Sequence, residues 1–314
     1  MRAMALKGLR GECMKKTKIE WCDMTWNPVT GCLHGCKYCY ARRIAERFGL
    51  DFAPKLGDPG MEGAKKYDSE AGIDTMLELE KPFKKNGRIQ PYPFGFQPTL
   101  HKYHLDQPAK VKTGKLIFVG SMTDLFGEWV PDEWIREVFE ACDRAPWHTY
   151  MFLTKNPNRY IELAKKDLLP RQHWYGYSAT RQDQLWHFHH AADCPCINLF
   201  VSIEPILEFM VTPFSTHLPA GWVIMGAETG SRKNKVVPEK RWIQEIAETC
   251  EWCGIPVFMK ESLQPIMGEE GMKRQFPLKM TVRKFQEVAY KSGVTTEQAF
   301  ESLAKASERR EENA

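Results

Sequence analysis

The sequence predicts an α/β fold, a TIM-like (β/α) barrel that is complete or partly open, and three observations support this. Short runs rich in β-branched and aromatic residues recur, and each is followed by a helical pattern. The apolar residues in these runs are nearly continuous, which is typical of parallel strands covered on both faces. Up to eight such runs can be counted, as a barrel requires. A doubly wound open sheet is the alternative.

The expected elements follow one another along the chain. Two early strand candidates cover residues 18–26 and 94–100, and six further strands cover residues 115–120, 148–154, 173–179, 198–204, 222–228 and 256–261. Helices are expected at residues 40–48, 131–145, 157–166, 181–192 and 238–253. Pro131 favours a helix start at its position, because its fixed φ suits the first turn.

Three parts are expected along the chain. Residues 1–16 form a flexible leader, with a second plausible start at Met14. Residues 17–262 form the barrel, and residues 263–314 form a C-terminal helical extension that ends in a charged tail. Residues 49–93 are rich in glycine, proline and charge, and we interpret them as an insertion over the barrel mouth after the first βα unit.

Composition narrows the class of protein. The 314 residues are 43% hydrophobic, and 44 basic against 40 acidic residues give a net charge of +4, too small to indicate a dedicated nucleic-acid binder. No apolar run approaches the roughly 20 residues of a membrane span, and no signal peptide is evident. We therefore expect a cytoplasmic protein. Ten cysteines in that reducing compartment indicate metal or redox chemistry.

Three cysteines lie within eight residues: Cys32, Cys36 and Cys39, spaced CxxxCxxC. Thiolates are soft ligands that suit iron-sulfur clusters, zinc and Cu(I). Structural zinc normally takes four ligands in two separated pairs, whereas a [4Fe-4S] cluster held by three cysteines keeps one iron open for another molecule. Gly31 and Gly35 allow sharp turns around a bulky group. Zinc or structural thiols are the alternative interpretation.

The cysteine motif resembles the signature of the radical SAM superfamily, because Tyr38 precedes the last cysteine and the loop follows the first expected strand. The segments IEWCDMTWNPVTGC, FVGSMTDLF, LTKNP, SIEP and VIMGAETG resemble a phage-associated radical SAM family of mostly unassigned chemistry, over about residues 17–262. The chain departs from the pattern in two places. LHG between the first two cysteines is the standard superfamily spacing, where many family members have a longer gap. PTLH at residues 98–101 stands where a GGE-like segment often holds the methionyl amine.

The resemblance implies cofactors and a reaction. A [4Fe-4S] cluster on the three cysteines would bind S-adenosyl-L-methionine and, with an external one-electron reductant, cleave it to a 5′-deoxyadenosyl radical. The phage association suggests modification or isomerisation of a nucleobase in DNA hypermodification, with DNA or a modified nucleotide as partner. One alternative is a cluster-binding, redox-sensing partner of a nucleic-acid enzyme. Another is radical repair of a DNA lesion, similar to photoproduct lyase chemistry.

Polar residues follow several expected strands, and the carboxyl ends of barrel strands are where such enzymes place their sites. The residues expected to bind the cofactor are Tyr38, Ser178, Glu204 and Glu228. A carboxylate at the end of a buried strand is costly unless it binds something. Lys155 and Lys260 are expected to pair with these carboxylates or with a carboxylate or phosphate of a ligand. Salt bridges among the side chains themselves are the alternative.

Two further groups have a plainer interpretation. Four cysteines have the spacing of a possible second metal site, for which buried structural thiols are favoured: Cys194, Cys196, Cys250 and Cys253. Three histidines cluster on an expected helix and are interpreted as surface residues rather than metal ligands: His187, His189 and His190.

Overall fold

The computed structural model describes residues 14–49, 64–66, 77–186, 198–212, 220–230, 232–278 and 280. The chain divides into two compact units, Met1–Arg274 and Gln275–Ala314. All elements named below belong to the first unit. No helix among the described residues has the length and apolarity needed to cross a membrane.

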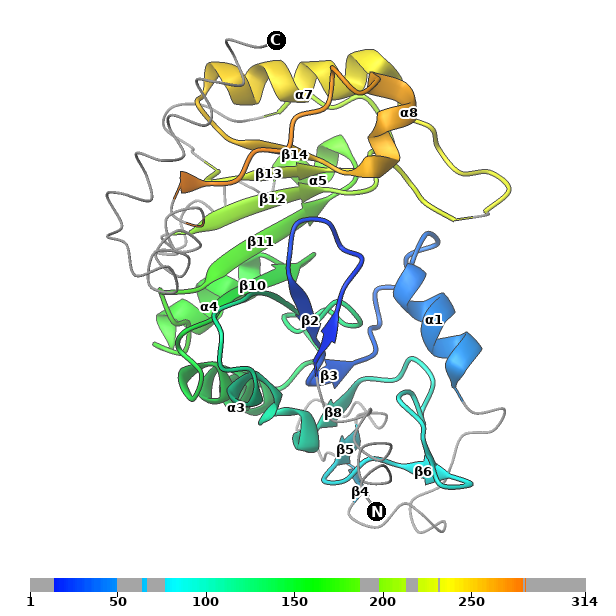
Figure 1. The fold of residues 1–314 in the computed structure, drawn as a ribbon, viewed down its shortest axis with the longest axis vertical. Helices are drawn as coiled ribbons and strands as arrows, with labels where there is room; N and C mark the ends of the chain where they lie inside the picture. Colours follow the sequence, from blue (N-terminus) through cyan, green and yellow to red (C-terminus); the bar gives the residue numbers. More distant parts are fainter. Residues whose placement is uncertain are drawn as a thin grey trace, which may run out of the picture. The chain divides into compact units, whose positions relative to one another are not determined.

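A curled, mostly parallel sheet forms the centre of the first unit (Figure 1). Its order, among the described residues, is β1 (Lys15–Lys16), β2 (Met24–Trp26), β9 (Leu116–Val119), β10 (Thr149–Thr154), β11 (Trp174–Ala179), β12 (Leu199–Ile203), β13 (Val223–Met225) and β14 (Val257–Met259). Only β1 is antiparallel to its neighbour. Strands β1 and β14 are the two edges of the order, so the α/β prediction is confirmed in its partly open form.

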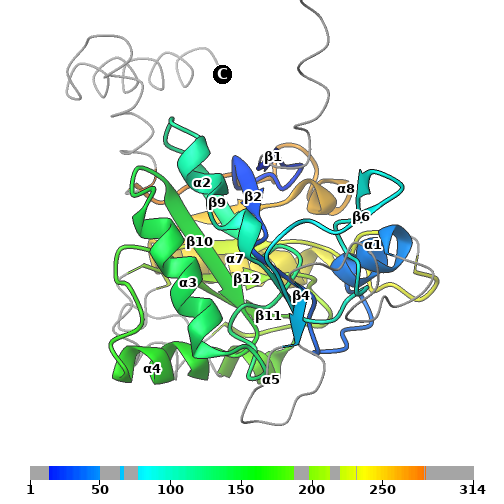
Figure 2. The same cartoon turned by 90° about the horizontal axis from the view of Figure 1, so that it is seen from below.

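Helices cover the outer face of the sheet, where alternate strand residues are apolar. After β9 and β10 come α3 (Asp132–Asp143) and α4 (Asn158–Lys165), and after β11 comes α5 (Gln182–Trp186), all outside the sheet in Figure 2. Trp134 and Phe139 of α3 are buried in one cluster with Ile117 and Phe152. Helix α7 (Lys240–Trp252) packs on the last strands in a second cluster. Each such fully buried side chain contributes roughly 1.5–3 kcal/mol.

The inner face of the sheet is filled by aromatic rings. The Trp21 ring lies 4.7 Å from that of Phe118 and 6.3 Å from those of Phe200 and Trp222. Gly176 leaves room for this packing, since a Cβ there would lie 2.2 Å from Phe200 Cζ. This interior is therefore packed, as in a barrel core, and the polar side chains of the site described below lie at or near the carboxyl ends of the strands.

Side-chain hydrogen bonds join the two edge regions of the sheet. Glu20, which precedes β2, accepts from the backbone N–H of Glu261 at 2.9 Å and from Arg274 Nη1 at 2.5 Å. Glu261 follows β14 and opens the 3₁₀ turn η2 (Glu261–Leu263), which leads into α8 (Gln264–Met267). Polar contacts thus link the edges that strand pairing leaves open.

A second sheet corrects two details of the expected strand list. Residues 94–100 are wrong as a barrel strand, because β2 already pairs directly with β9 and leaves no place between them. Instead β8 (Thr99–His101) belongs to a smaller sheet, ordered β3 (Val29–Thr30), β8, β5 (Leu77–Leu79) and β4 (Ala64–Lys66). The run 18–26 forms a strand only at Met24–Trp26, since Trp21 turns into the interior.

Short elements complete the described part of the insertion and its exit. Strands β6 (Lys84–Lys85) and β7 (Arg88–Ile89) form a hairpin within the expected insertion 49–93. The 3₁₀ turn η1 (Lys102–His104) and α2 (Gln107–Lys110) lead from β8 to β9. Much of the insertion, and most of the expected extension 263–314, lies outside the described residues.

Candidate functional site

The cysteine loop runs from the end of β3 to helix α1 (Tyr40–Phe48). Gly31 has φ +89, and a Cβ there would lie 2.2 Å from Gln97 O, so no other residue fits its place. Gly35 also has a positive φ, but the space beside it is open. Cys39 caps α1, because its Sγ accepts the backbone N–H of Arg42 at 3.3 Å.

Backbone hydrogen bonds hold the start of this loop between two distant segments. Gly31 N–H donates to Met122 O at 2.9 Å, and Thr123 Oγ1 donates to Gly31 O at 2.6 Å. Cys32 N–H donates to Phe96 O at 3.2 Å. The loop is therefore positioned by the residues that follow β9, at the carboxyl end of the parallel sheet.

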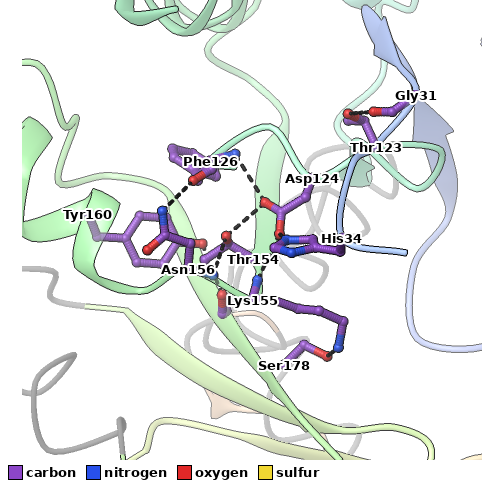
Figure 3. A network of polar contacts seen from close by, with 11 residues as sticks. Gly31, His34, Thr123, Asp124, Phe126, Thr154, Lys155, Asn156, Tyr160 and Ser178 are labelled. Carbon is purple, nitrogen blue, oxygen red and sulfur yellow. Dashed lines mark hydrogen bonds and ion pairs between the residues drawn. The ribbon is translucent and has the colours of Figure 1, made fainter. Parts of the chain in front are cut away.

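Asp124 joins the loop to the ends of β9 and β10 (Figure 3). Its Oδ1 accepts from Phe126 N–H at 3.1 Å and from Thr154 Oγ1 at 2.7 Å. Its Oδ2 accepts from Lys155 N–H at 2.8 Å and lies 2.7 Å from Nε2 of His34, which belongs to the cysteine loop. Since Asp124 is only 5% exposed, these four partners take the place of water around its carboxylate.

The three loop cysteines influence one another electrostatically. Burial raises the pKa of Cys32 to about 12, and the negative charges of Asp124, Cys36 and Cys39 add to this, against a backbone hydrogen bond from His34. Without a nearby cation the Cys32 thiol therefore stays protonated at neutral pH. Among the residues that the structure describes, no three His, Cys, Asp or Glu side chains are arranged to hold a metal ion.

Tyr38 and Ser178, two of the predicted cofactor residues, both lie near the Lys155 ammonium. The Lys155 Nζ donates to Ser178 Oγ at 3.2 Å and lies 5.6 Å from the centre of the Tyr38 ring. The Tyr38 hydroxyl reaches Thr180 Oγ1 at 3.5 Å. The structure thus brings the loop before Cys39 together with the carboxyl end of β11.

Glu204, at the end of β12, pairs with a lysine from the next but one strand. Its Oε1 lies 2.9 Å from Lys260 Nζ, and its Oε2 accepts from Ser202 Oγ at 3.1 Å. Burial lowers the pKa of Lys260, but attraction to Glu204 and their hydrogen bond outweigh this, so the net shift is upward. The carboxylate also fills the space beside Gly226, where a Cβ would lie 2.6 Å from Oε1.

Glu228 forms a second ion pair. Arg232 donates to both of its oxygens, with Nε at 2.5 Å from Oε1 and Nη2 at 2.6 Å from Oε2. The hydrogen bonds from Arg232 hold the pKa of Glu228 below its usual range, and the charge of Arg43 contributes to this shift. For Glu204 and Glu228 the structure therefore shows the ion pairs that sequence reasoning had left as the alternative.

His34 is the residue that sequence reasoning missed, although it lies inside the CxxxCxxC motif. Its ring packs edge-on against Trp129, with centroids 4.8 Å apart. The sequence does show a titratable side chain, His34, between two cysteines, and an aspartate, Asp124, in the segment FVGSMTD. However, the two residues that form the contact are 90 residues apart in the chain. Local sequence does not reveal such a pairing.

The remaining sequence predictions fall partly outside the described residues. Cys250 is buried among apolar residues of α7 and the sheet, and burial raises its pKa to about 12, as a structural thiol requires. Cys253 is half-buried. Five of the predicted residues lie outside the part of the chain that the structure describes: His187, His189, His190, Cys194 and Cys196.

Comparison with known proteins gives one family and two distant structures. A mutant of spore photoproduct lyase matches with a TM-score of 0.42 and 11% identity, covering 83% of this chain and 81% of that chain. Macrophomate synthase matches with a TM-score of 0.30 and 10% identity, covering 68% and 81%. Both similarities are too distant to indicate an activity. A comparison with curated proteins found no match. The family described as "Protein of unknown function (DUF5131)" matches residues 16–291, and the chain belongs to this family.

Proposed function

We propose that this protein is a radical SAM enzyme that holds a [4Fe-4S] cluster on Cys32, Cys36 and Cys39. The observation that carries the proposal is the CxxxCxxC loop, bound through Gly31 and His34 to the carboxyl end of β9 in a curled parallel sheet. Ligands of such sheets bind at the carboxyl ends of the strands.

The donor set fits the proposed cluster in its chemistry. Three soft sulfur ligands on one loop suit iron and leave one iron without a protein ligand. Since no three of the described side chains are arranged as a metal site, binding requires at least one cysteine side chain to turn. Open space beside Gly35 allows a local adjustment.

Cluster and S-adenosyl-L-methionine together would supply reductive carbon-sulfur cleavage to a 5′-deoxyadenosyl radical, with an electron from an external reductant. The chain's own residues would bind and orient the reactants. His34 and Asp124 hold the loop, and Ser178 and Tyr38 offer a hydroxyl and an aromatic face beside it. The packed rings around Trp21, itself 2% exposed, fill the inner face of the sheet.

For the substrate we propose a nucleobase, modified or isomerised in phage DNA hypermodification, on the strength of the sequence resemblance. Comparing the nucleosides of cells with and without the protein by mass spectrometry tests this part. A new or missing modified nucleoside supports it. An unchanged nucleoside pool, with active enzyme present, contradicts it.

Anaerobic reconstitution with iron and sulfide tests the cluster. We expect about four irons per chain, and loss of that iron in Cys32→Ser, Cys36→Ser and Cys39→Ser. Cys253→Ser is the matched control, because this half-buried thiol is the C-cap of α7, outside the loop, and the variant should keep the iron. Zinc in place of iron in anaerobically purified protein would overturn the proposal.

The reaction is tested separately on the reconstituted protein. With dithionite and S-adenosyl-L-methionine, chromatography should detect 5′-deoxyadenosine, and the loop variants should produce none. An intact cluster without any 5′-deoxyadenosine would favour a cluster-binding redox partner of a nucleic-acid enzyme instead. Recovery of intact S-adenosyl-L-methionine after turnover of damaged DNA would favour a repair lyase.

A further inference from the structure

The charged groups at the carboxyl ends of the strands are mostly matched with one another. Asp124 has four hydrogen-bond donors, Glu204 faces Lys260, and Glu228 is held by Arg232. A half-buried charge that lacks a partner is costly, so such matching is expected. An unmatched charge at this end of the sheet therefore indicates a place where a ligand supplies the partner.

Lys155 is that unmatched charge. Its Nζ donates to the neutral Ser178 hydroxyl at 3.2 Å and lies 5.6 Å from the Tyr38 ring centre, and no carboxylate of the described residues is within ion-pair distance of it. The side chain is half-buried. An ammonium has three N–H donors, so two of them remain for a ligand.

The ammonium of Lys155 is also held in position. Its backbone N–H donates to Asp124 Oδ2 at 2.8 Å, and the same oxygen binds His34 of the cysteine loop. Ser178, only 8% exposed, receives the other end of the side chain. The cation is therefore fixed at both ends, which lowers the entropy cost of binding a ligand there.

We propose that Lys155, with the Ser178 hydroxyl beside it, binds an anionic oxygen group of a ligand, a phosphate or a carboxylate. The Tyr38 ring lies one residue before Cys39, so the anion sits beside the cysteine loop. The inference rests on the proposed function only in taking this end of the sheet as the place where ligands bind. It does not require a bound cluster.

Two sources of the anion are distinguished by two matched pairs of probes. Thymidine 5′-monophosphate against thymidine tests a phosphate, and S-adenosylhomocysteine against 5′-methylthioadenosine tests the carboxylate of an amino-acid moiety. Calorimetric titration of the full chain at low salt measures all four affinities. A charge-assisted hydrogen bond predicts that the anionic member of one pair binds about tenfold to a hundredfold more tightly than its neutral partner.

Variants of Lys155 show whether this side chain causes the preference. Lys155→Met should abolish it by weakening only the anionic probe, while Lys155→Arg should keep most of it. Lys112→Met is the matched control, because Lys112 Nζ also lies 5.6 Å from an aromatic ring, that of Trp147, but is exposed and bonded to Ala109 O. It should keep the full preference. Urea unfolding confirms that each variant is folded.

Each outcome decides the proposal. A preference in the nucleotide pair that Lys155→Met removes assigns a phosphate, and one in the second pair assigns a carboxylate. Three results would overturn the inference. Neither pair shows a preference for its anionic member, the preference survives in Lys155→Met, or Lys112→Met removes it as well. Iron content is measured on the same preparations. If the protein binds no cluster but shows a preference that depends on Lys155, only the proposed function is refuted. If the protein binds the cluster but shows no preference, only the anion site is refuted.

Discussion

Replacing Asp124 tests the claim that one carboxylate holds the cysteine loop against the sheet. In Asp124→Ala four donors lose their acceptor: the backbone N–H groups of Phe126 and Lys155, the Thr154 hydroxyl and the His34 ring. The hydroxyl can rotate and the half-exposed imidazole can reach water. The two backbone N–H groups are fixed by the chain and cannot compensate.

The size of the effect follows from these two fixed donors. A hydrogen bond to a charged acceptor contributes about 1.5–3 kcal/mol, so losing two predicts that Asp124→Ala lowers the free energy of unfolding by about 3–6 kcal/mol. Asp124→Asn keeps one carbonyl oxygen but turns an N–H₂ group toward the other fixed donor. We therefore expect about 1–3 kcal/mol for Asp124→Asn.

Urea unfolding followed by circular dichroism measures these losses. A second readout is the rate at which iodoacetamide alkylates the loop cysteines in metal-free protein, which should rise in both variants because the His34 anchor is lost. Glu140→Ala, on the exposed face of α3, is the control and should change stability by no more than about 0.5 kcal/mol. A loss below about 1 kcal/mol in Asp124→Ala, with unchanged alkylation, would refute the reasoning.

Three further predictions concern the loop, the small sheet and an ion pair. Gly31→Ala should destabilise the protein by more than about 3 kcal/mol in urea unfolding, because the new Cβ meets backbone atoms at a positive φ. Burial, with the charge of a neighbouring histidine, holds the pKa of His101 well below 6.5. The contribution of His101 to stability is thus constant above about pH 6.5 and falls by up to about 1.4 kcal/mol per pH unit below it, since only the unfolded chain binds this proton. Burial also lowers the pKa of His104, which adds to the slope in the same direction. His101→Gln should flatten this slope. Lys260→Met should cost about 1–3 kcal/mol, because it leaves the Glu204 carboxylate half-buried and unpaired.

Matched variants give each of these predictions a control. Gly35→Ala has the same positive φ but open space, so it should lose only about 1–2 kcal/mol, and equal losses in both glycine variants would contradict the steric argument. The unfolding slope is compared for wild type and His101→Gln between about pH 7.5 and 5.5, and identical slopes would exclude His101 as the cause. A Glu204→Gln, Lys260→Met double variant that is as unstable as the sum of its parts would show that the pair is not coupled.

The positions of the parallel strands could be predicted from the sequence because each strand carries its own local pattern. The run 115–120 is continuously apolar, since a central parallel strand is covered on both faces, and β9 lies within it. The same reasoning failed for residues 94–100, where a run that also contains buried apolar residues enters a different sheet. Apolar periodicity states that a strand is buried, but it does not name the neighbour with which the strand pairs.

The site shows the same division. The three cysteines and their glycines are neighbours in the chain, so their spacing was visible as a motif, and the positive φ of Gly31 agrees with it. The pairing of His34 with Asp124 depends on how β2 and β9 lie side by side. The sequence alone does not show which side chains Lys155 and Lys260 contact at the carboxyl ends of the strands.

By itself, then, the sequence determined what is encoded within short stretches: the alternation of strands and helices, and the spacing of the three cysteines in the loop before α1. Only the tertiary structure decided that Glu204 pairs with Lys260 and that Lys155 donates to a neutral hydroxyl. The physical reason is that ion pairing acts through distances of a few ångströms, and the curl of the sheet sets those distances between residues far apart in the chain.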